Sequence, residues 1–277
     1  MKFTRSAKSG INLNQLKGCQ MTSMMPINND LLTLWNTPLA SGQMLAPIQY
    51  PDAPDDPIVF VGMNPSFSVA GWKSLQQHNS SGLPDPATVF QWPNPVFNQQ
   101  HAIAWEQIAL QKYAYFKWHR QLACIAGNPW YHLDLFTVRE TNQTALTLQV
   151  LKSMRPLAVN PFGTDQLDVF DRAINLIRPK AVVVANALAS RIYLDRRTPG
   201  RQSGCCCHID STIDGHKFPV FFSGMLTGQR ALDIFSRERL FCQVSKHLGR
   251  SKEFEEWCAG TLPDCQDEDI DSDLCES

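Results

Sequence analysis

An apolar run leads through Gly62 and Met63 to an asparagine, Asn64, in the segment Pro57-Ile58-Val59-Phe60-Val61-Gly62-Met63-Asn64-Pro65-Ser66. The run predicts a buried strand of a parallel sheet, and ligands bind at the carboxyl ends of such strands. Gly62 permits a tight turn and the close approach of a ligand, while Pro65 keeps the chain extended and Asn64 in a fixed orientation. A carboxamide there can orient a water molecule and stabilise developing charge without titrating. The alternative is a plain turn with Asn64 as a helix cap.

Three more apolar segments predict buried strands, and they span residues 130–136, 181–185 and 218–222. The first of them contains His132 and Asp134, and the second leads into Asn186. The third leads into the loop Ser223-Gly224-Met225-Leu226-Thr227-Gly228-Gln229-Arg230. Parallel strands place their carboxyl ends at one edge of a sheet, so we expect these residues to lie near Asn64.

Helices are predicted between the strands from the helical spacing of apolar residues. They cover about residues 101–126, 144–154, 165–178, 187–194 and a last segment that ends near residue 248. This alternation predicts an α/β protein with three α/β/α layers and a central, mostly parallel four-stranded sheet. Residues 66–100, rich in Ser, Gly, Pro and Asn, predict a long loop, and residues 196–216 a polar loop with room for a short hairpin.

The length of 277 residues suits one large α/β domain with peripheral segments. We expect an N-terminal extension over residues 1–50, the α/β domain over 51–250, and an acidic tail over 251–277 that is disordered from about residue 264. No run of about 18 apolar residues predicts a membrane span. The N-terminus lacks a secretory apolar core. We therefore expect a cytoplasmic monomer with no membrane partner.

The formal net charge of −1 argues against binding nucleic acid by bulk charge. The distribution is uneven, because arginines crowd one segment at Arg191, Arg196, Arg197 and Arg201. This cluster is either a solvated surface or a loop that faces phosphates. Nine cysteines at irregular spacings form no disulfide framework, and the run Cys205-Cys206-Cys207-His208 has no Cys-x-x-Cys partner to complete a metal site. We expect reduced thiols, no metal and no cofactor.

The segment Gly62-Met63-Asn64-Pro65-Ser66 resembles the first motif of the uracil-DNA glycosylase superfamily, whose branches read Gly-(Ile/Met)-Asn-Pro-(Gly/Ser). The resemblance covers about residues 55–248 and includes the order of the strands. It implies that family's fold and a DNA partner from which one nucleotide is flipped out of the duplex. By this resemblance Asn64 is the residue that orients the attacking water, and leaving-group stabilisation carries much of the catalysis because an amide accepts no full proton.

The resemblance also implies a set of base-binding residues. They are Gly62, Met63, Ser66, Phe67, His132, Asp134 and Asn186, with Trp72, Phe90, Trp92 and Phe97 as other candidates for stacking on the base. Ser66 stands where the uracil-specific branch has a tyrosine that blocks the pyrimidine 5-position, so 5-substituted bases can enter; alternatively it merely fits the turn. Asp134 stands where the family often has an asparagine whose amide forms hydrogen bonds with N3–H and O4 of uracil. A carboxylate only accepts hydrogen bonds, which suits the amine of cytosine, unless Asp134 caps a helix or pairs with Arg139.

The family's second motif, His-Pro-Ser-Pro-Leu-Ser followed in some branches by an arginine, is only partly matched. If Arg230 is aligned with that arginine, Leu226 falls at the position of the leucine that wedges into the duplex, and Thr227 falls at the position of the serine. Phe222 or Ser223 then stands where the family has its histidine. DNA-binding roles therefore fall on Ser223, Gly224, Leu226, Thr227 and Arg230. The alternative is a turn whose Leu226 packs into the core. Without the histidine, efficient uracil excision is not expected.

The sequence thus predicts a metal-independent DNA glycosylase that hydrolyses the bond between the sugar and a modified pyrimidine, a 5-substituted cytosine being favoured. Such a specificity would suit bacterial defence against phages with modified cytosines. Excision of uracil or mismatched thymine in repair is one alternative, and a catalytically silent DNA-binding relative is another. An unrelated α/β hydrolase or nucleotide binder is disfavoured, because Gly-x-Ser-x-Gly, Gly-x-Gly-x-x-Gly and the phosphate-binding loop motif are missing.

Overall fold

Four apolar strands form the parallel centre of one sheet in the computed structural model, which describes residues 21–262 except 67, 202–205 and 229. They are β3 (Ile58–Gly62), β4 (Trp130–Asp134), β7 (Ala181–Ala185) and β10 (Lys217–Ser223). The sheet order is β4-β3-β7-β10-β9-β8, in which β9 (His208–Ser211) and β8 (Gly200–Arg201) add an antiparallel edge. The protein is therefore mixed α/β with a mostly parallel sheet, but the sheet has six strands and not the expected four.

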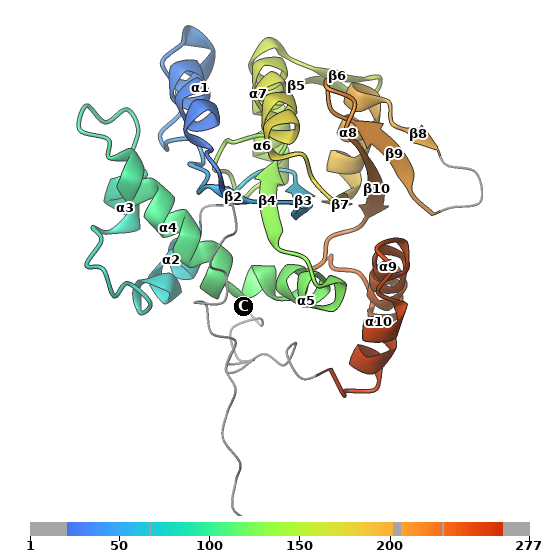
Figure 1. Ribbon diagram of the computed structural model, residues 1–277. Helices are drawn as coiled ribbons and strands as arrows, with labels where there is room; N and C mark the ends of the chain where they lie inside the picture. Colours follow the sequence, from blue (N-terminus) through green and yellow to red (C-terminus); the bar gives the residue numbers. More distant parts are fainter. Residues whose placement is uncertain (1–20, 67, 202–205, 229, 263–277) are drawn as a thin grey trace, which may run out of the picture.

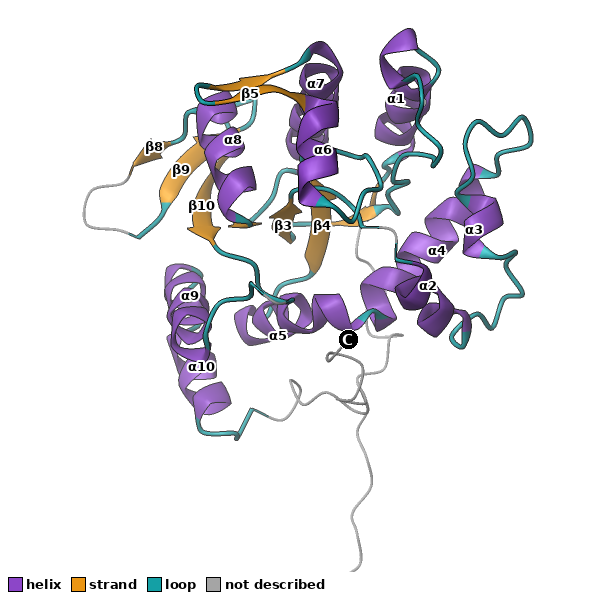
Figure 2. Cartoon of the chain, turned by 180° about the vertical axis from the view of Figure 1, so that it is seen from behind, coloured by secondary structure: helices purple, strands orange, loops and turns teal. Residues whose placement is uncertain are grey.

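Alternate residues of the central strands enter two separate cores, because both faces of the sheet are covered by helices (Figures 1 and 2). Val59 and Val61 face the first layer, whereas Ile58 and Phe60 face the second. The first layer comprises α1 (Met25–Trp35), α6 (Gln143–Val150), α7 (Pro161–Ile177) and α8 (Ala187–Arg197). The second comprises α5 (Lys117–Ala126), α9 (Ile234–His247) and α10 (Ser251–Cys258).

Helix α7 illustrates how the local sequence sets the ends of these elements. The Asn160 side chain accepts a hydrogen bond from the Gly163 amide at 2.8 Å, and Pro161 occupies the first turn, where its missing N–H costs no helical bond. The helix ends at Arg178, which adopts a left-handed conformation with φ of 52°. Its buried side then packs against α1 in the first core.

A third cluster of apolar residues forms a cap beside the sheet, which we define as α2 (Val69–Gln76), α3 (Pro86–Val89) and α4 (Gln99–Lys112). Trp72, Phe90 and Trp105 lie at its centre. The three helices lie together at one end of the molecule in Figure 1. The prediction of one long loop over residues 66–100 is therefore wrong, since two helices interrupt it.

Other expected boundaries also change. The helix predicted over 101–126 is broken at Tyr113, where α4 ends and the short helix η3 (Ala114–Phe116) leads into α5. The helix predicted over 144–154 ends early, because β5 (Leu151–Met154) forms a hairpin with β6 (Leu157–Val159). The hairpin foreseen between 196 and 216 is present as β8 and β9.

The remaining elements are short. They are β1 (Met21–Thr22), which pairs with β2 (Ala53–Pro54), and the helix η2 (Pro38–Ala40). The acidic segment from residue 264 lies outside the described residues. Within the described ranges, no helix has both the length and the apolar character required to cross a membrane.

Candidate functional site

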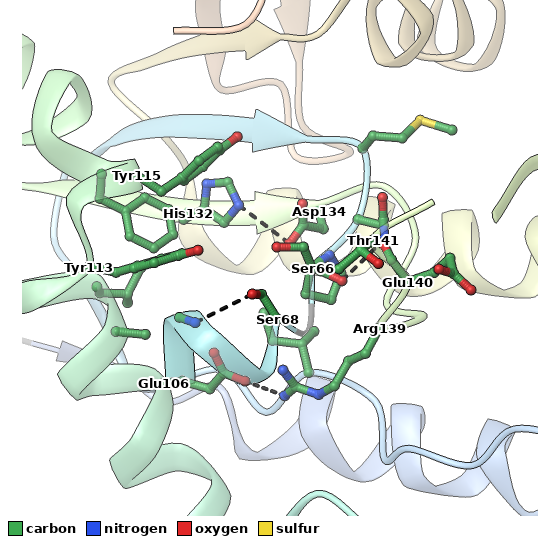
Figure 3. Close-up of a pocket in the computed structure, with 18 of the residues that line it drawn as sticks. Ser66, Ser68, Glu106, Tyr113, Tyr115, His132, Asp134, Arg139, Glu140 and Thr141 are labelled. Atoms are coloured by element: carbon green, nitrogen blue, oxygen red, sulfur yellow. Dashed lines mark hydrogen bonds and ion pairs between the residues drawn. The ribbon is translucent and has the colours of Figure 1, made fainter. Parts of the chain in front are cut away.

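A cavity of about 250 Å³ opens at the carboxyl edge of the parallel strands, between the sheet and the cap. Residues from the ends of the four parallel strands line it, and they include Asn64, Asp134, Asn186 and Met225. The cap and the η3 turn close the other side with Ser68, Glu106, Tyr113 and Tyr115, as Figure 3 shows. This is the edge at which ligands bind in open α/β sheets.

Asn64 is held at the cavity by its own amide group. Its Nδ2 donates hydrogen bonds to the carbonyl oxygens of Pro65 at 3.1 Å, Val138 at 3.1 Å and Glu140 at 2.6 Å. These acceptors fix the orientation of the amide, and Oδ1 makes no hydrogen bond to the described residues. The side chain is half-buried and lines the cavity, so its oxygen can accept a hydrogen bond from a water molecule. Asn64 caps no helix, because Ser68 is the N-cap of α2, so the helix-cap part of the alternative interpretation is wrong.

His132 and Asp134 form the floor of the cavity because residues two apart on β4 point to the same face. Asp134 Oδ2 lies 3.3 Å from His132 Nε2, in a geometry outside that of a hydrogen bond, and both side chains are more than nine-tenths buried. Asp134 neither caps a helix nor pairs with Arg139, so both structural alternatives for it are wrong. A carboxylate oxygen that receives no hydrogen bond at this depth is a costly feature unless a ligand or water binds it.

Gly62 accommodates this carboxylate. The parallel register places Gly62 opposite Asp134, and a Cβ atom added at Gly62 would lie 2.3 Å from Asp134 Oδ1 and 3.2 Å from His132 Nε2. The close approach expected at this glycine is therefore made by the protein's own side chains.

Two tyrosine hydroxyls contribute donors to the same cavity. The Tyr50 oxygen accepts a hydrogen bond from the Asp134 main-chain amide at 3.2 Å. Burial, and secondarily the Asp134 carboxylate, raises the pKa of Tyr50 well above its ordinary value, and the same causes in the same order raise the pKa of Tyr115. Both hydroxyls therefore keep their protons and can donate hydrogen bonds to a bound molecule.

A buried ion pair joins the cap to the sheet at the opposite wall (Figure 3). Arg139 Nη2 bonds to Glu106 Oε1, and its guanidinium carbon lies 3.9 Å from the centroid of the Phe90 ring. Burial raises the pKa of Glu106, while Arg139 opposes the rise. Neither residue was predicted as part of the site. The sequence feature that could have identified Glu106 is a carboxylate on the apolar side of a predicted helix, near Trp105 and Ala109.

The other predicted base-binding residues lie in three different situations. Met63 and Ser66 both line the cavity, Met63 buried and Ser66 exposed. Asn186 also lines it, but its Oδ1 caps α8 by accepting from the Leu188 and Ala189 amides at 2.9 and 3.1 Å. Only its Nδ2 is left to meet a ligand. Phe67 lies outside the described residues.

Of the aromatic stacking candidates that the structure describes, only Trp72 lines the cavity. Trp72 is nevertheless 8% exposed and packs on Phe90 and Trp105 in the cap. The aromatic wall of the cavity comes instead from the η3 turn, which follows α4 and was predicted to be part of a continuous helix. This wall consists of Tyr113, which directly precedes η3, and of Tyr115 and Phe116 within η3.

The loop after β10 corrects the predicted wedge. Leu226 is only 1% exposed and packs in the second core, so it cannot insert into a duplex from this position. The alternative interpretation, a leucine that folds back, is the one observed. Its neighbour Met225 lines the cavity, and the Met225 carbonyl accepts a hydrogen bond from the Leu232 amide at 2.8 Å, which folds the loop back on itself.

The other residues of this loop that the structure describes lie outside the cavity lining. The Ser223 hydroxyl donates to the Gly224 carbonyl at 2.8 Å, and a Cβ at Gly224 would lie 2.9 Å from Leu232 Cδ2. Thr227 is half-buried and Arg230 is exposed.

The arginine cluster is largely neutralised. Arg196 pairs with Asp168 and Asp171, and Arg197 pairs with Asp171 and Asp210. The guanidinium groups of these two arginines already have carboxylate partners, which disfavours a phosphate-facing role for them.

The cysteine-rich segment shows no metal site where it is described. Among residues 21–262 outside the gaps, no group of three or more His, Cys, Asp and Glu side chains is placed to hold a metal ion. Cys124, which lies outside the run for which reduced thiols were expected, is disulfide-bonded. Cys206, Cys242 and Cys258 carry free thiols, and Cys205 lies outside the described residues.

Comparison with known proteins adds no assignment. No model of a known protein family matches the sequence, and no curated protein matches it either.

Proposed function

We propose that the protein is a DNA glycosylase that hydrolyses the bond between deoxyribose and a flipped, modified pyrimidine, with 5-substituted cytosines as the favoured substrates. One observation supports this most strongly. The Asn64 amide is locked by three carbonyls with its oxygen left for a water molecule, and it shares a cavity with the Asp134 carboxylate. The cavity thus offers a place for attacking water and a separate acceptor for an amino-bearing base.

The chemistry of the reaction suits these groups. As the glycosidic bond breaks, positive charge develops on the sugar and negative charge on the base, so fixed dipoles and a positioned water supply much of the rate. Asn64 Oδ1 would orient the water, and Asp134 would accept a hydrogen bond from the exocyclic amine of cytosine. Ser66 is small and exposed at the rim, which leaves room for a substituent at the 5-position.

A second candidate is excision of uracil or mismatched thymine. The hydroxyls of Tyr50 and Tyr115 favour it, since both keep their protons and can donate to base carbonyls. The acceptor-only Asp134 at the floor opposes it, because uracil presents carbonyl oxygens where cytosine presents an amine.

The test is a panel of duplexes that contain uracil, mismatched thymine or 5-substituted cytosines, with released base identified by mass spectrometry. We expect release from at least one 5-substituted cytosine, and a loss of roughly 10²–10³-fold in rate for Asn64→Ala with DNA binding retained. Asn36→Ala, an exposed asparagine at the end of α1, is the matched control. Binding without release from any duplex would instead indicate a silent DNA-binding relative.

A further inference from the structure

The departing base requires a proton donor that Asn64 does not provide. When the glycosidic bond breaks, its electron pair stays on the base, and protonation of the base makes this step easier. The amide hydrogens of Asn64 are directed at main-chain carbonyls, and an amide does not give up a proton in any case. The inference that follows rests on the proposed function, because it concerns the same reaction.

Other groups around the cavity are poorly suited to the transfer. The pKa values of Tyr50 and Tyr115 are raised by burial, so their phenols donate hydrogen bonds but release protons reluctantly. Glu106 is bonded to Arg139 across the cavity. Imidazole, by contrast, is the side chain that ordinarily gives and takes protons near neutral pH.

His132 has the geometry of a donor. Its Nδ1 is enclosed and has no hydrogen-bond partner, so Nε2 is the ring nitrogen that can reach a bound molecule. Asp134 Oδ2 lies 3.3 Å from Nε2 without hydrogen-bond geometry, so the carboxylate stabilises a positive charge on the ring without taking its N–H (Figure 3).

We propose that His132 donates a proton from Nε2 to the departing base, while the adjacent Asp134 carboxylate stabilises the imidazolium. The bond from the sugar C1′ to the base nitrogen breaks, and its electron pair stays on the base. The Nε2 proton moves to a ring nitrogen or carbonyl oxygen of the base. Water adds to C1′ and loses a proton to solvent, and the neutral imidazole is reprotonated from solvent before the next turnover.

The groups around His132 determine how a positive charge on its ring is stabilised. Asp134 is the carboxylate nearest the ring, and Glu106 on α4 also interacts with it electrostatically. His119 on α5 packs edge-on with ring centroids 5.9 Å apart, and its pKa is lowered well below the ordinary value by burial, so it stays neutral. Phe116 of η3 contributes an uncharged ring with its centroid 5.0 Å away. Asp134 therefore supplies most of the charge stabilisation.

The test uses a leaving-group series on the intact protein. Single-turnover release is measured from duplexes that carry the 5-methyl and 5-fluoro forms of the pyrimidine released fastest by the wild-type protein. His132→Gln should slow release of the 5-methyl base by about 10²–10⁴-fold. For the 5-fluoro base, which is the better leaving group, the loss of release rate in His132→Gln should be at least about tenfold smaller. His78→Gln, an exposed histidine of the cap, is the matched control.

The outcomes separate the two proposals. No release from any duplex by the wild-type protein refutes the proposed function. Release by the wild type with an equal loss for both bases, or with no loss in His132→Gln, refutes the role of His132 alone. If His132→Gln does not fold, Asp134→Asn provides the second measurement. Its loss of release rate should likewise be at least about tenfold greater for the 5-methyl base than for the 5-fluoro base, and equal losses overturn the inference.

Discussion

Replacing Gly62 by alanine should disable the site by displacing Asp134. A methyl group at position 62 would lie 2.3 Å from Asp134 Oδ1, whereas ordinary van der Waals contact begins at 3.4 Å. The carboxylate must therefore retreat by about 1.1 Å, or β3 and β4 must separate by a similar amount. The ring of His132 has little room to yield, since its Nε2 would already be 3.2 Å from the new atom.

The geometry gives a magnitude for both activity and stability. A misplacement of about 1 Å in a catalytic site can cost on the order of 10²-fold in rate, so we expect Gly62→Ala to lose about that much. Overpacking costs roughly 1–3 kcal/mol in the free energy of unfolding, which lowers the melting temperature by several degrees without preventing folding. The loss of rate should therefore exceed what unfolding of the variant explains.

The assay is single-turnover base release with enzyme in excess, with urea denaturation as the measure of stability. Gly200→Ala is the matched control, because its new methyl group meets no atom of the described residues closer than 3.9 Å. The double variant Gly62→Ala/Asp134→Ser removes the clash. It should regain stability relative to Gly62→Ala, and it should be no slower than Asp134→Ser alone.

Two results would refute this reasoning. A Gly62→Ala variant that retains base release within about threefold of wild type would show that the position of the Asp134 carboxylate is unimportant. Independent, additive effects of the two substitutions would show that the clash is absent and that β3 relaxes around the methyl group.

Three further predictions concern Leu226, Asp134 and His119. Leu226→Ala should lower the free energy of unfolding by about 2–5 kcal/mol, as expected for a buried leucine; a change below about 1 kcal/mol in urea denaturation would contradict its burial. Asp134→Asn should shift base preference from cytosine-type toward uracil-type duplexes, and an unchanged ratio of release rates would remove Asp134 from base reading. Burial lowers the pKa of His119 well below 6.5, so the unfolded chain takes up a proton below that pH that the folded chain does not. Stability should therefore fall on acidification by up to about 1.4 kcal/mol per pH unit, and His119→Phe should remove this part of the slope between pH 6.5 and 5; parallel slopes would show that His119 does not contribute.

The centre of the fold could be predicted because its strands are apolar at every position. Both faces of β3 and β7 are buried, so the sequence shows uninterrupted runs bounded by turn residues. The antiparallel strands at the edge were predicted only as room for a short hairpin, because β9 mixes polar and apolar residues and lies next to the last strand of the sheet. Helices α2 and α3 of the cap were missed because they are short and are separated by segments rich in Ser, Gly and Pro, which hides the spacing of Trp72 and Leu75.

Only those site residues that follow directly from the strand order could be predicted. Asn64 and Asp134 both line the cavity at the edge foreseen, since each follows from its place at a strand end. The ion pair between Glu106 and Arg139 joins residues 33 positions apart on different elements, and no local pattern specifies such a contact. Leu226 was misplaced because exposure of a loop side chain depends on how the loop folds back, which spacing does not reveal.

The parallel register of β3 and β4 makes the small size of Gly62 and the position of the Asp134 carboxylate depend on each other. Pairing places position 62 directly opposite position 134, and the period of two in β4 places His132 on the same face. A larger residue at 62 would fill the space of the carboxylate, while loss of the carboxylate would remove the need for glycine. In the proposed reaction, the glycine that opens the Asn64 segment would serve the base-reading side of the cavity, and the asparagine two residues later would orient the water. Substitutions at positions 62 and 64 are therefore expected to affect different steps of that reaction.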